Sequence, residues 1–254
     1  MNALSSILSH PAIWRGAELG RVSTPSVPSG YAELDAELPG GGWPTAALSE
    51  ILPQHEGIGE LRILGHALAN LAAQGRWLAW IAPPYLPYAP ALQAAGIDLS
   101  RLLVIRTRTP RETLWAVEQT LRSQTCGAVL AWPDKIAYAE LRRLQLAAEG
   151  SNTLAVLFRS QRCITEATPA ALRLRLDTQG GALAARILKR RGGVLGRSIT
   201  LTPPPVVERG ACFMPAHTGI NLNFNQNGKN QHAVDRLAFP APAARSLRAG
   251  LSIN

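Results

Sequence analysis

Residues 47–74, ALSEILPQHEGIGELRILGHALANLAAQ, decide how the fold is interpreted, because an apolar strand here passes through two glycines into a helix. A strand, a glycine-containing loop and a helix form the phosphate-binding loop of many ATPases. That loop also needs a lysine that reaches the phosphates and a hydroxyl group that holds magnesium. Neither is present, since Ile58 and Glu60 follow the two glycines and the first lysine of the chain is Lys135.

Pro53, Gly57, Gly59 and Glu60 are therefore expected to form a vestigial loop that binds no cofactor. Glu60 would place negative charge where a triphosphate has to lie. The magnesium-binding aspartate is also missing, because Trp132 stands at the end of that strand, and the loop APPYLPYAP at 82–90 has no catalytic carboxylate. The sequence predicts that the chain is not an enzyme and holds neither a cofactor nor a metal ion.

Short apolar runs alternate with amphipathic segments between residues 47 and 158, which predicts an α/β fold. Near-continuous apolar strands separated by helices indicate a mostly parallel sheet with helices on both faces. Two further β-like runs meet at Thr178-Gln179-Gly180-Gly181, a turn that predicts an antiparallel hairpin extension at the C-terminal side. The expected strands are 47–52, 77–82, 102–107, 127–133 and 153–158, and the expected helices are 60–74, 88–96, 111–124 and 137–149.

The 254 residues, 46% of them hydrophobic, suffice for one α/β domain with a substantial core. We expect an N-terminal helix or arm at 1–27, a core at 28–201 and a poorly ordered basic tail at 202–254. The tail lacks apolar periodicity but carries scattered apolar side chains. Ordering on a partner and packing along the chain's own surface are both open for it.

Charge is placed unevenly along the chain. Residues 1–127 carry nine arginines and ten acidic residues, whereas residues 128–254 carry seventeen basic and seven acidic residues. A pI of about 10.3 favours an anionic partner, either nucleic acid or an acidic protein surface. Twenty-three arginines against three lysines also fit a GC-rich genome, which explains the ratio of the two residues but not their uneven placement.

The stretch RILKRRGGVLGR at 186–197 concentrates the positive charge and contains no acidic residue. It predicts a surface that binds DNA or a protein partner, and the alternative is a solvated strand edge on which basic residues prevent pairing. The candidate DNA- or partner-binding residues are Arg186, Lys189, Arg190, Arg191 and Arg197.

Other features bear on partners and location. Tyr85 and Tyr88 lie in a proline-rich loop, which predicts either a partner-binding loop or a merely stiffened connection. Cys126, Cys163 and Cys212 are scattered without metal-ligand spacing. With no signal peptide and no apolar run of membrane-spanning length, a soluble, cytoplasmic protein without membrane contact is expected.

Several motifs together resemble a known family. The segment VPSGYAELDAELPGGGWPTAALSEIL at 27–52 resembles the beginning of the core of the recombinase RecA. In order, LDAELPGGGWP, GIGELR, GRWLAWIAPPYLPYAPALQAAGIDLSRLLVIR, CGAVLAW, LRRLQLAAE and ARILKRRGG resemble ImuA, over about residues 28–193. The resemblance implies a RecA-like core without a working nucleotide loop.

The same resemblance implies a role in SOS-induced translesion DNA synthesis. The implied partners are RecA, the polymerase homologue ImuB and an error-prone C-family DNA polymerase, with direct contact to DNA as a further expectation. A protein that acts as a non-catalytic adaptor in this process is the leading interpretation. The alternative is a cell-division inhibitor of the SulA kind, which would also act by protein binding.

Overall fold

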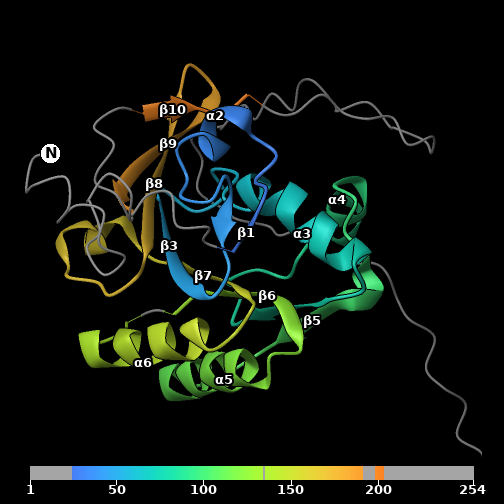
Figure 1. The fold of residues 1–254 in the computed structure, drawn as a ribbon, viewed down its shortest axis with the longest axis vertical. Helices are drawn as coiled ribbons and strands as arrows, with labels where there is room; N and C mark the ends of the chain where they lie inside the picture. Colours follow the sequence, from blue (N-terminus) through green and yellow to red (C-terminus); the bar gives the residue numbers. More distant parts are fainter. Residues whose placement is uncertain (1–24, 134, 191–197, 203–254) are drawn as a thin grey trace, which may run out of the picture. The chain divides into compact units, whose positions relative to one another are not determined.

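The computed structural model describes residues 25–133, 135–190 and 198–202. Figure 1 shows a central sheet with helices packed on either side. The strands are β1 (Ser26–Val27), β2 (Trp43–Pro44), β3 (Ala47–Pro53), β4 (Trp77–Ile81), β5 (Leu102–Ile105), β6 (Cys126–Ala131), β7 (Leu154–Phe158), β8 (Leu172–Gln179), β9 (Ala182–Lys189) and β10 (Ser198–Thr200). The helices are α2 (Ala32–Asp35), α3 (Gly65–Ala73), α4 (Ala89–Ala94), α5 (Pro110–Ser123) and α6 (Tyr138–Glu149). Short 3₁₀ turns lie at Arg62–Leu64, Leu99–Arg101 and Gln161–Thr165.

The larger sheet is mixed and has the strand order β10-β9-β8-β3-β7-β6-β4-β5. Strands β8, β3, β7, β6, β4 and β5 pair in parallel, because a helix or a long connection returns the chain between them. The hairpin expected around residues 178–181 is present, since β8 and β9 pair antiparallel across Gly180 and Gly181. Strand β10 adds antiparallel to β9.

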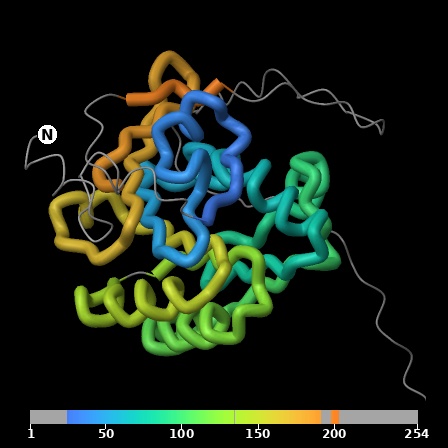
Figure 2. The backbone as a smooth tube through the Cα atoms, in the orientation of Figure 1, coloured from blue at the N-terminus to red at the C-terminus, as the bar shows by residue number. Residues whose placement is uncertain are grey.

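Two hydrophobic clusters lie on opposite faces of this sheet. Along each inner strand alternate side chains point to opposite faces, so that Trp80 joins one cluster and Ile81 the other. One cluster is covered by α2 and α3, and the other by α5 and α6. Helices therefore cover both faces, as the backbone trace in Figure 2 also shows.

Residues 31–43, which precede β3, complete the hydrophobic cluster on the α2 and α3 side of the sheet. Its large apolar side chains, Tyr31, Leu34, Leu38 and Trp43, are buried against α3 and the sheet. A turn at Gly30 admits only glycine easily, because φ is +84° and an added Cβ would come within 2.6 Å of His66. The segment is thus part of the core rather than a separate arm.

The prediction of a RecA-like core was wrong. Such a core needs the glycine-containing loop to run directly into a helix whose N-terminus faces the phosphates. Here the 3₁₀ turn Arg62–Leu64 follows the loop, and α3 begins only at Gly65. The mixed sheet is built without that loop geometry.

A buried cluster of charges joins β3 to the strands on either side of it, β7 and β8. Glu50, in the middle of β3, has no exposed surface. Its carboxylate pairs with Arg159 Nη1 at 3.0 Å and with Arg173 Nε at 2.9 Å. Arg159 follows β7 and Arg173 lies on β8, which are the two strands that flank β3. One carboxylate therefore joins the parallel strands to the hairpin.

The same arginines fix the connection between β7 and β8. Arg173 donates to the main-chain carbonyls of Cys163 at 2.6 Å, Ile164 at 3.2 Å and Glu166 at 2.7 Å. Arg159 also pairs with the Glu166 carboxylate at 2.7 Å, and this hydrogen bond lowers the pKa of Glu166. A guanidinium group has five N–H donors, which is why each arginine can satisfy several acceptors here.

Some of the expected domain organisation lies outside the described residues. This holds for residues 1–24 of the expected arm at 1–27, and for residues 203–254 of the expected tail. Both assignments stay predictions.

Replacing Glu50 should destabilise the fold strongly. In Glu50→Gln the side-chain shape is kept while two buried guanidinium groups lose their shared counter-charge, which should lower the free energy of unfolding by about 3 kcal/mol. Urea denaturation followed by circular dichroism measures this value. Glu33→Gln, at an exposed position of α2, is the matched control. A difference between the two variants below about 1 kcal/mol would contradict the role given to Glu50.

Candidate partner-binding site

Loops that follow parallel strands meet at the carboxyl edge of the sheet. In open α/β sheets this edge is where ligands usually bind. Here it brings together the loop after β3 at 54–61, the loop after β4 at 82–88 and the segment after β6 that begins at Trp132. The first two contain the residues that the sequence predicted as a vestigial loop and a partner loop.

The loop after β3 has its amide groups occupied by its own carboxylate. Gly57 N donates to Glu60 Oε1 at 3.4 Å, and Gly59 N donates to Glu60 Oε2 at 3.2 Å. Both glycines have positive φ, +77° and +102°, which turns their N–H groups toward one side. Pro53 lies apart from them as the last residue of β3. The position that an external anion would need is held by Glu60.

Aromatic side chains fill the middle of the carboxyl edge. The Trp132 ring stacks on the Phe158 ring with centroids 4.7 Å apart and lies 6.0 Å from the Trp80 ring. Offset aromatic pairs of this kind bury large areas and exclude water. The place where the sequence lacks a magnesium-binding aspartate is therefore occupied by hydrophobic packing.

The loop after β4 exposes two aromatic rings to solvent. Tyr85 and Tyr88 are 69% and 72% exposed, and Leu86 between them is equally open. Tyr85 Oη donates to Glu56 Oε2 at 2.9 Å, and this hydrogen bond raises the pKa of the Tyr85 phenol. The bond joins the loops after β3 and β4. Prolines at 83, 84 and 87 restrict the backbone, so the rings are presented at little entropic cost.

The three described basic residues of the hairpin have different surroundings. The Arg186 side chain is exposed and forms no hydrogen bond or ion pair within the described part of the chain. Lys189 Nζ donates to the Thr168 carbonyl at 2.7 Å, and burial lowers its pKa. Arg190 binds Glu37 through both the main-chain carbonyl and the carboxylate, the latter at 3.1 Å. The other two candidates, Arg191 and Arg197, lie outside the described residues.

The pairing register explains why these cations separate. A register shift between Arg173 and Leu174 places Lys189 opposite Arg173. Lys189 then lies over the connection between β7 and β8, whereas the next residue, Arg190, reaches Glu37 beside α2. Two of the three described cations thus stabilise the fold, and a binding role for the hairpin stays a prediction.

The sequence interpretation missed an exposed aromatic face on α5 and α6. Trp115 and Tyr138 are 62% and 56% exposed, and Leu146 is 51% exposed. A signal was available, because Trp115 lies off the apolar stripe of α5 formed by Leu114, Val117 and Leu121. A large aromatic residue outside that stripe has no core to enter.

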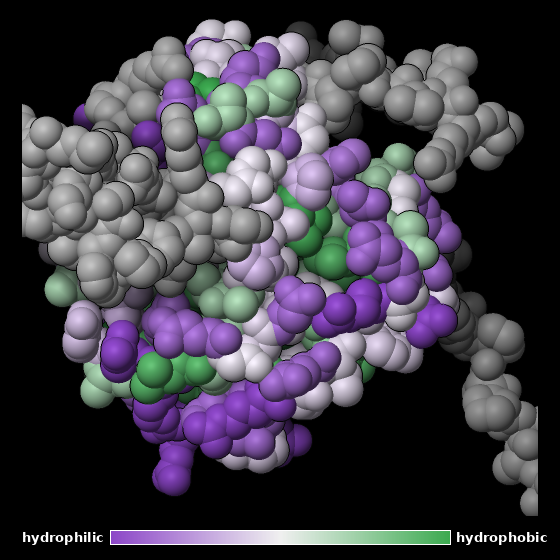
Figure 3. Space-filling model, viewed as in Figure 1, coloured by the Kyte–Doolittle hydropathy of each residue, from purple (hydrophilic) through white to green (hydrophobic). Residues whose placement is uncertain are grey.

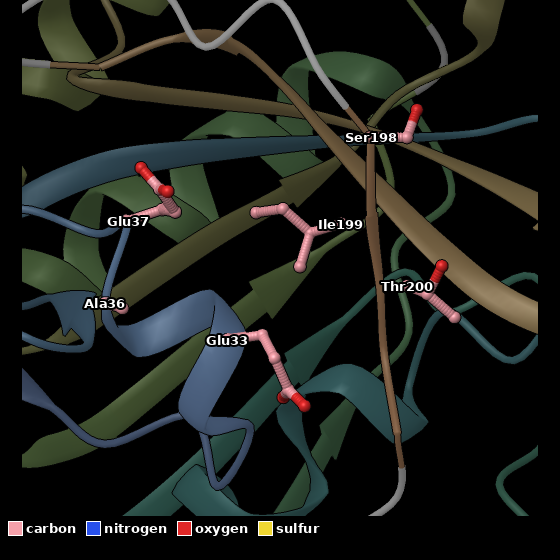
Figure 4. Close-up of a pocket in the computed structure, with 6 residues that line it drawn as sticks. All are labelled: Glu33, Ala36, Glu37, Ser198, Ile199 and Thr200. Atoms are coloured by element: carbon pink, nitrogen blue, oxygen red, sulfur yellow. The ribbon is translucent and has the colours of Figure 1, made fainter.

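A pocket of about 330 Å³ lies between α2 and β10. Figure 4 shows the Ile199 side chain pointing from β10 toward α2, with Glu33 and Glu37 on the opposite wall. The Glu37 carboxylate is already paired with Arg190. The lining residues are Glu33, Ala36, Glu37, Ser198, Ile199 and Thr200, so that the two glutamates are its ionisable groups.

Two kinds of feature are absent from the described residues. Among them, no group of three or more histidine, cysteine, aspartate or glutamate side chains is placed to hold a metal ion. None of their helices combines the length and the apolar character that crossing a bilayer requires.

The two hairpin arginines should differ sharply in their effect on stability. Arg190→Ala removes bonds to Glu37, and we expect it to lower the free energy of unfolding by about 1.5 kcal/mol. Arg186→Ala removes an exposed side chain without such bonds and should change it by less than about 0.5 kcal/mol. Chemical denaturation of both variants tests this. An equal decrease in the free energy of unfolding for both variants would show that the bonds between Arg190 and Glu37 do not stabilise the fold.

Comparison with known proteins shows similarity to two kinds of protein, SulA and ImuA. A family model described as "Cell division inhibitor SulA" matches residues 47–155. The chain is 31% identical over 99 residues to the cell division inhibitor SulA of Edwardsiella piscicida, covering 39% of this chain and 59% of that protein. It is 30% identical over 134 residues to the protein ImuA of Caulobacter vibrioides, covering 51% and 55% respectively. The chain therefore spans a little over half the length of these curated relatives.

The family model also corrects the assignment to a RecA-like core, because the family that it describes is SulA. A similar solved structure is that of SulA from Pseudomonas aeruginosa. That structure is 27% identical, covers 46% of this chain and 99% of its own, and has a TM-score of 0.39. Residues 47–155 run from β3 to the start of β7, so the matched part is the parallel sheet with its helices. The chain is thus similar to proteins of the SulA and ImuA type.

Proposed function

We propose that this protein is a non-catalytic, damage-induced protein that acts by binding other proteins, as an adaptor of the ImuA kind in SOS-induced translesion DNA synthesis. The observation that carries the proposal is the similarity of the chain to both SulA and ImuA, together with the match of the SulA family model to residues 47–155 of the sheet. The proposed partners are RecA, the polymerase homologue ImuB and an error-prone C-family DNA polymerase.

The chemistry of the carboxyl edge supports binding rather than catalysis. Glu60 occupies the amide groups of the loop after β3, and the rings of Trp132 and Phe158 pack where a ligand crevice would open. The same edge exposes Tyr85 and Tyr88 on a proline-restricted loop. Tyrosine anchors presented by a stiff loop are favoured in protein interfaces.

One observation favours an adaptor over an inhibitor of the SulA kind. The match to the SulA family model ends at residue 155, whereas the described chain continues through β8, β9 and β10. The hairpin is integral to the sheet because Glu50 of β3 pairs with Arg173 of β8. The similarity to ImuA extends over a longer stretch of 134 residues. Direct contact with DNA is a secondary part of the proposal, for which Arg186 is the exposed candidate.

The proposal predicts a phenotype that depends on DNA damage. A bacterial strain that lacks the gene should show fewer mutations after ultraviolet irradiation, and expression of the full chain should restore them. The double variant Tyr85→Ala/Tyr88→Ala should fail to restore them if this loop docks on a partner, because two exposed anchors are lost. Mutation frequency per surviving cell is the measurement, and Gln119→Ala, at an exposed position of α5, is the control.

Overexpression without DNA damage separates the two interpretations. An adaptor for translesion synthesis should leave cell length unchanged, whereas an inhibitor of division should produce filaments. Filamentation together with an unchanged mutation frequency would overturn the adaptor proposal and favour the inhibitor.

A further inference from the structure

Strand β5 (Leu102–Ile105) is one edge of the larger sheet. It is the last strand in the order of that sheet, and it pairs in parallel with β4 on one side (Figure 1). On its other side the described residues place no strand. A sheet edge carries unpaired N–H and C=O groups, to which a further strand can add.

The outward backbone groups in the middle of β5 belong to Val104. The Ile105 carbonyl accepts the Ala82 N–H at 2.8 Å, so that Ile105 faces β4. Successive residues of a strand direct their N–H and C=O groups to opposite sides, which turns those of Val104 away from β4. Among the described residues, none from a loop or a helix forms a hydrogen bond with the Val104 backbone. One donor and one acceptor are therefore available at the centre of the edge.

The side chains around this edge are apolar and partly exposed. Leu103 is 47% exposed, and Trp77, at the beginning of β4, is 43% exposed. Strand alternation and the pairing of Leu103 with Ala79 place both on the face of the sheet that α5 covers. Leu102 and Val104 point to the opposite face, where Leu102 packs against the cluster on the α2 and α3 side. A strand beside β5 would meet apolar side chains on both faces.

Strand β5 lacks several of the features by which edge strands avoid pairing. Such strands are often protected by a proline, by a charged side chain or by a bulge. Leu102–Ile105 contains neither a proline nor a charged residue, and its pairing with β4 has no register shift. The short length of β5 limits an addition to a segment of a few residues.

The two ends of β5 differ in charge. Before the strand, Arg101 and Asp98 carry opposite charges in and beside one 3₁₀ turn. After the strand, Arg106 and Arg108 are exposed, and the Glu112 carboxylate accepts Arg108 N at 2.8 Å. The Arg106 side chain forms no hydrogen bond or ion pair with any described residue. These two arginines and one glutamate leave one positive charge in excess at this end.

These features fit a segment of another protein better than other occupants. Two copies of β5 that pair antiparallel around Val104 would place Arg106 opposite Leu102, which gives the guanidinium group no counter-charge. The chain's own segments outside the described residues are net positive, since 1–24 and 203–254 together contain three acidic and seven basic residues. The edge fits an extended, apolar segment that brings a carboxylate to Arg106.

We propose that β5 accepts, as an additional strand, an extended segment of a partner protein with apolar residues at its centre and an acidic residue at one end. The N–H and C=O groups of Val104 pair with the backbone of the segment, as in other additions to a sheet edge. Its central side chains pack on Leu103 and Trp77, and its carboxylate pairs with Arg106. The inference goes beyond the proposed role of the loop after β4 and does not depend on it.

A peptide selection restricted to this edge tests the proposal. The full-length chain is immobilised and panned against a phage library of random decapeptides, with an excess of the soluble Val104→Pro variant as competitor. Proline is tolerated in an edge strand where its nitrogen faces away from the sheet, so this variant should stay folded and lose the outward N–H. We expect peptides with a proline-free, apolar centre and an acidic residue at one end.

Fluorescence anisotropy with the synthesised peptides measures the individual contributions. Val104→Pro should weaken binding roughly tenfold or more, and Leu103→Thr about fivefold. Arg106→Gln should weaken binding about fivefold and reduce its dependence on salt. The matched controls on α6, Arg142→Gln and Leu146→Ala, change exposed side chains of the same types and should leave binding unchanged. Melting temperatures show whether the variants are folded.

Backbone pairing is tested on the peptide itself, so that the result does not depend on the folding of a variant. Each backbone amide of the tightest peptide is N-methylated in turn. Alternate residues of an added strand face β5, so methylation should abolish binding at every second central position and change it by less than about threefold at the positions between. In the free chain the Val104 amide should exchange rapidly with solvent and become protected when the peptide is bound.

Several results would overturn the proposal. One is a selection without enrichment of such peptides, and another is equal weakening by the control variants. N-methylation effects that do not alternate would show that the peptide binds without adding as a strand. Slow exchange of Val104 in the free monomer would assign the edge to the chain's own segments, and self-association in sedimentation that Val104→Pro removes would assign it to a second copy.

Discussion

The charge cluster at Glu50 is the interaction on which the rest of the sheet depends. Glu50 lies in β3, the strand at which the parallel part of the sheet meets the hairpin. A buried carboxylate is costly unless it is paired. Here Arg173 on β8 and Arg159, which directly follows β7, supply the counter-charges. The pairing needs β7 and β8 on the correct sides of β3, so it favours one strand order over others. Arg173 then also fixes the connection that crosses between them.

With the sheet fixed in this way, the carboxyl edge can be filled without loss of the fold. Parallel strands end there in loops that many α/β proteins use for ligands. In this chain Glu60 satisfies the loop amides and Trp132 packs on Phe158. What remains accessible at this edge is a stiff loop with exposed rings. The strands whose ends elsewhere carry a ligand site here carry this loop, on which Tyr85 and Tyr88 are exposed.

The strands, the helices and the hairpin turn at Gly180 could be predicted because each depends on residues close together in sequence. The Glu50 cluster could not, since Glu50 and Arg159 are 109 positions apart and nothing local marks the pair. The different surroundings of Lys189 and Arg190 within the basic stretch could not be predicted for a related reason. Strand alternation and a register shift send Lys189 and Arg190 to different partners, which a count of charges does not reveal. The RecA-like core was inferred from a resemblance and was overturned by comparison.

The position of the arginines separates their structural from their interaction roles. An arginine that meets a carbonyl or carboxylate within the chain loses its value for binding, because its donors are already used. This applies to Arg159, Arg173 and Arg190, all of which lie on or beside the sheet extension. Arg142 on α6, in contrast, faces solvent and has no ion pair within the described residues, and the lower face in Figure 3, where α5 and α6 lie, is largely hydrophilic. Some of the described arginines therefore build the fold, while others lie on its surface.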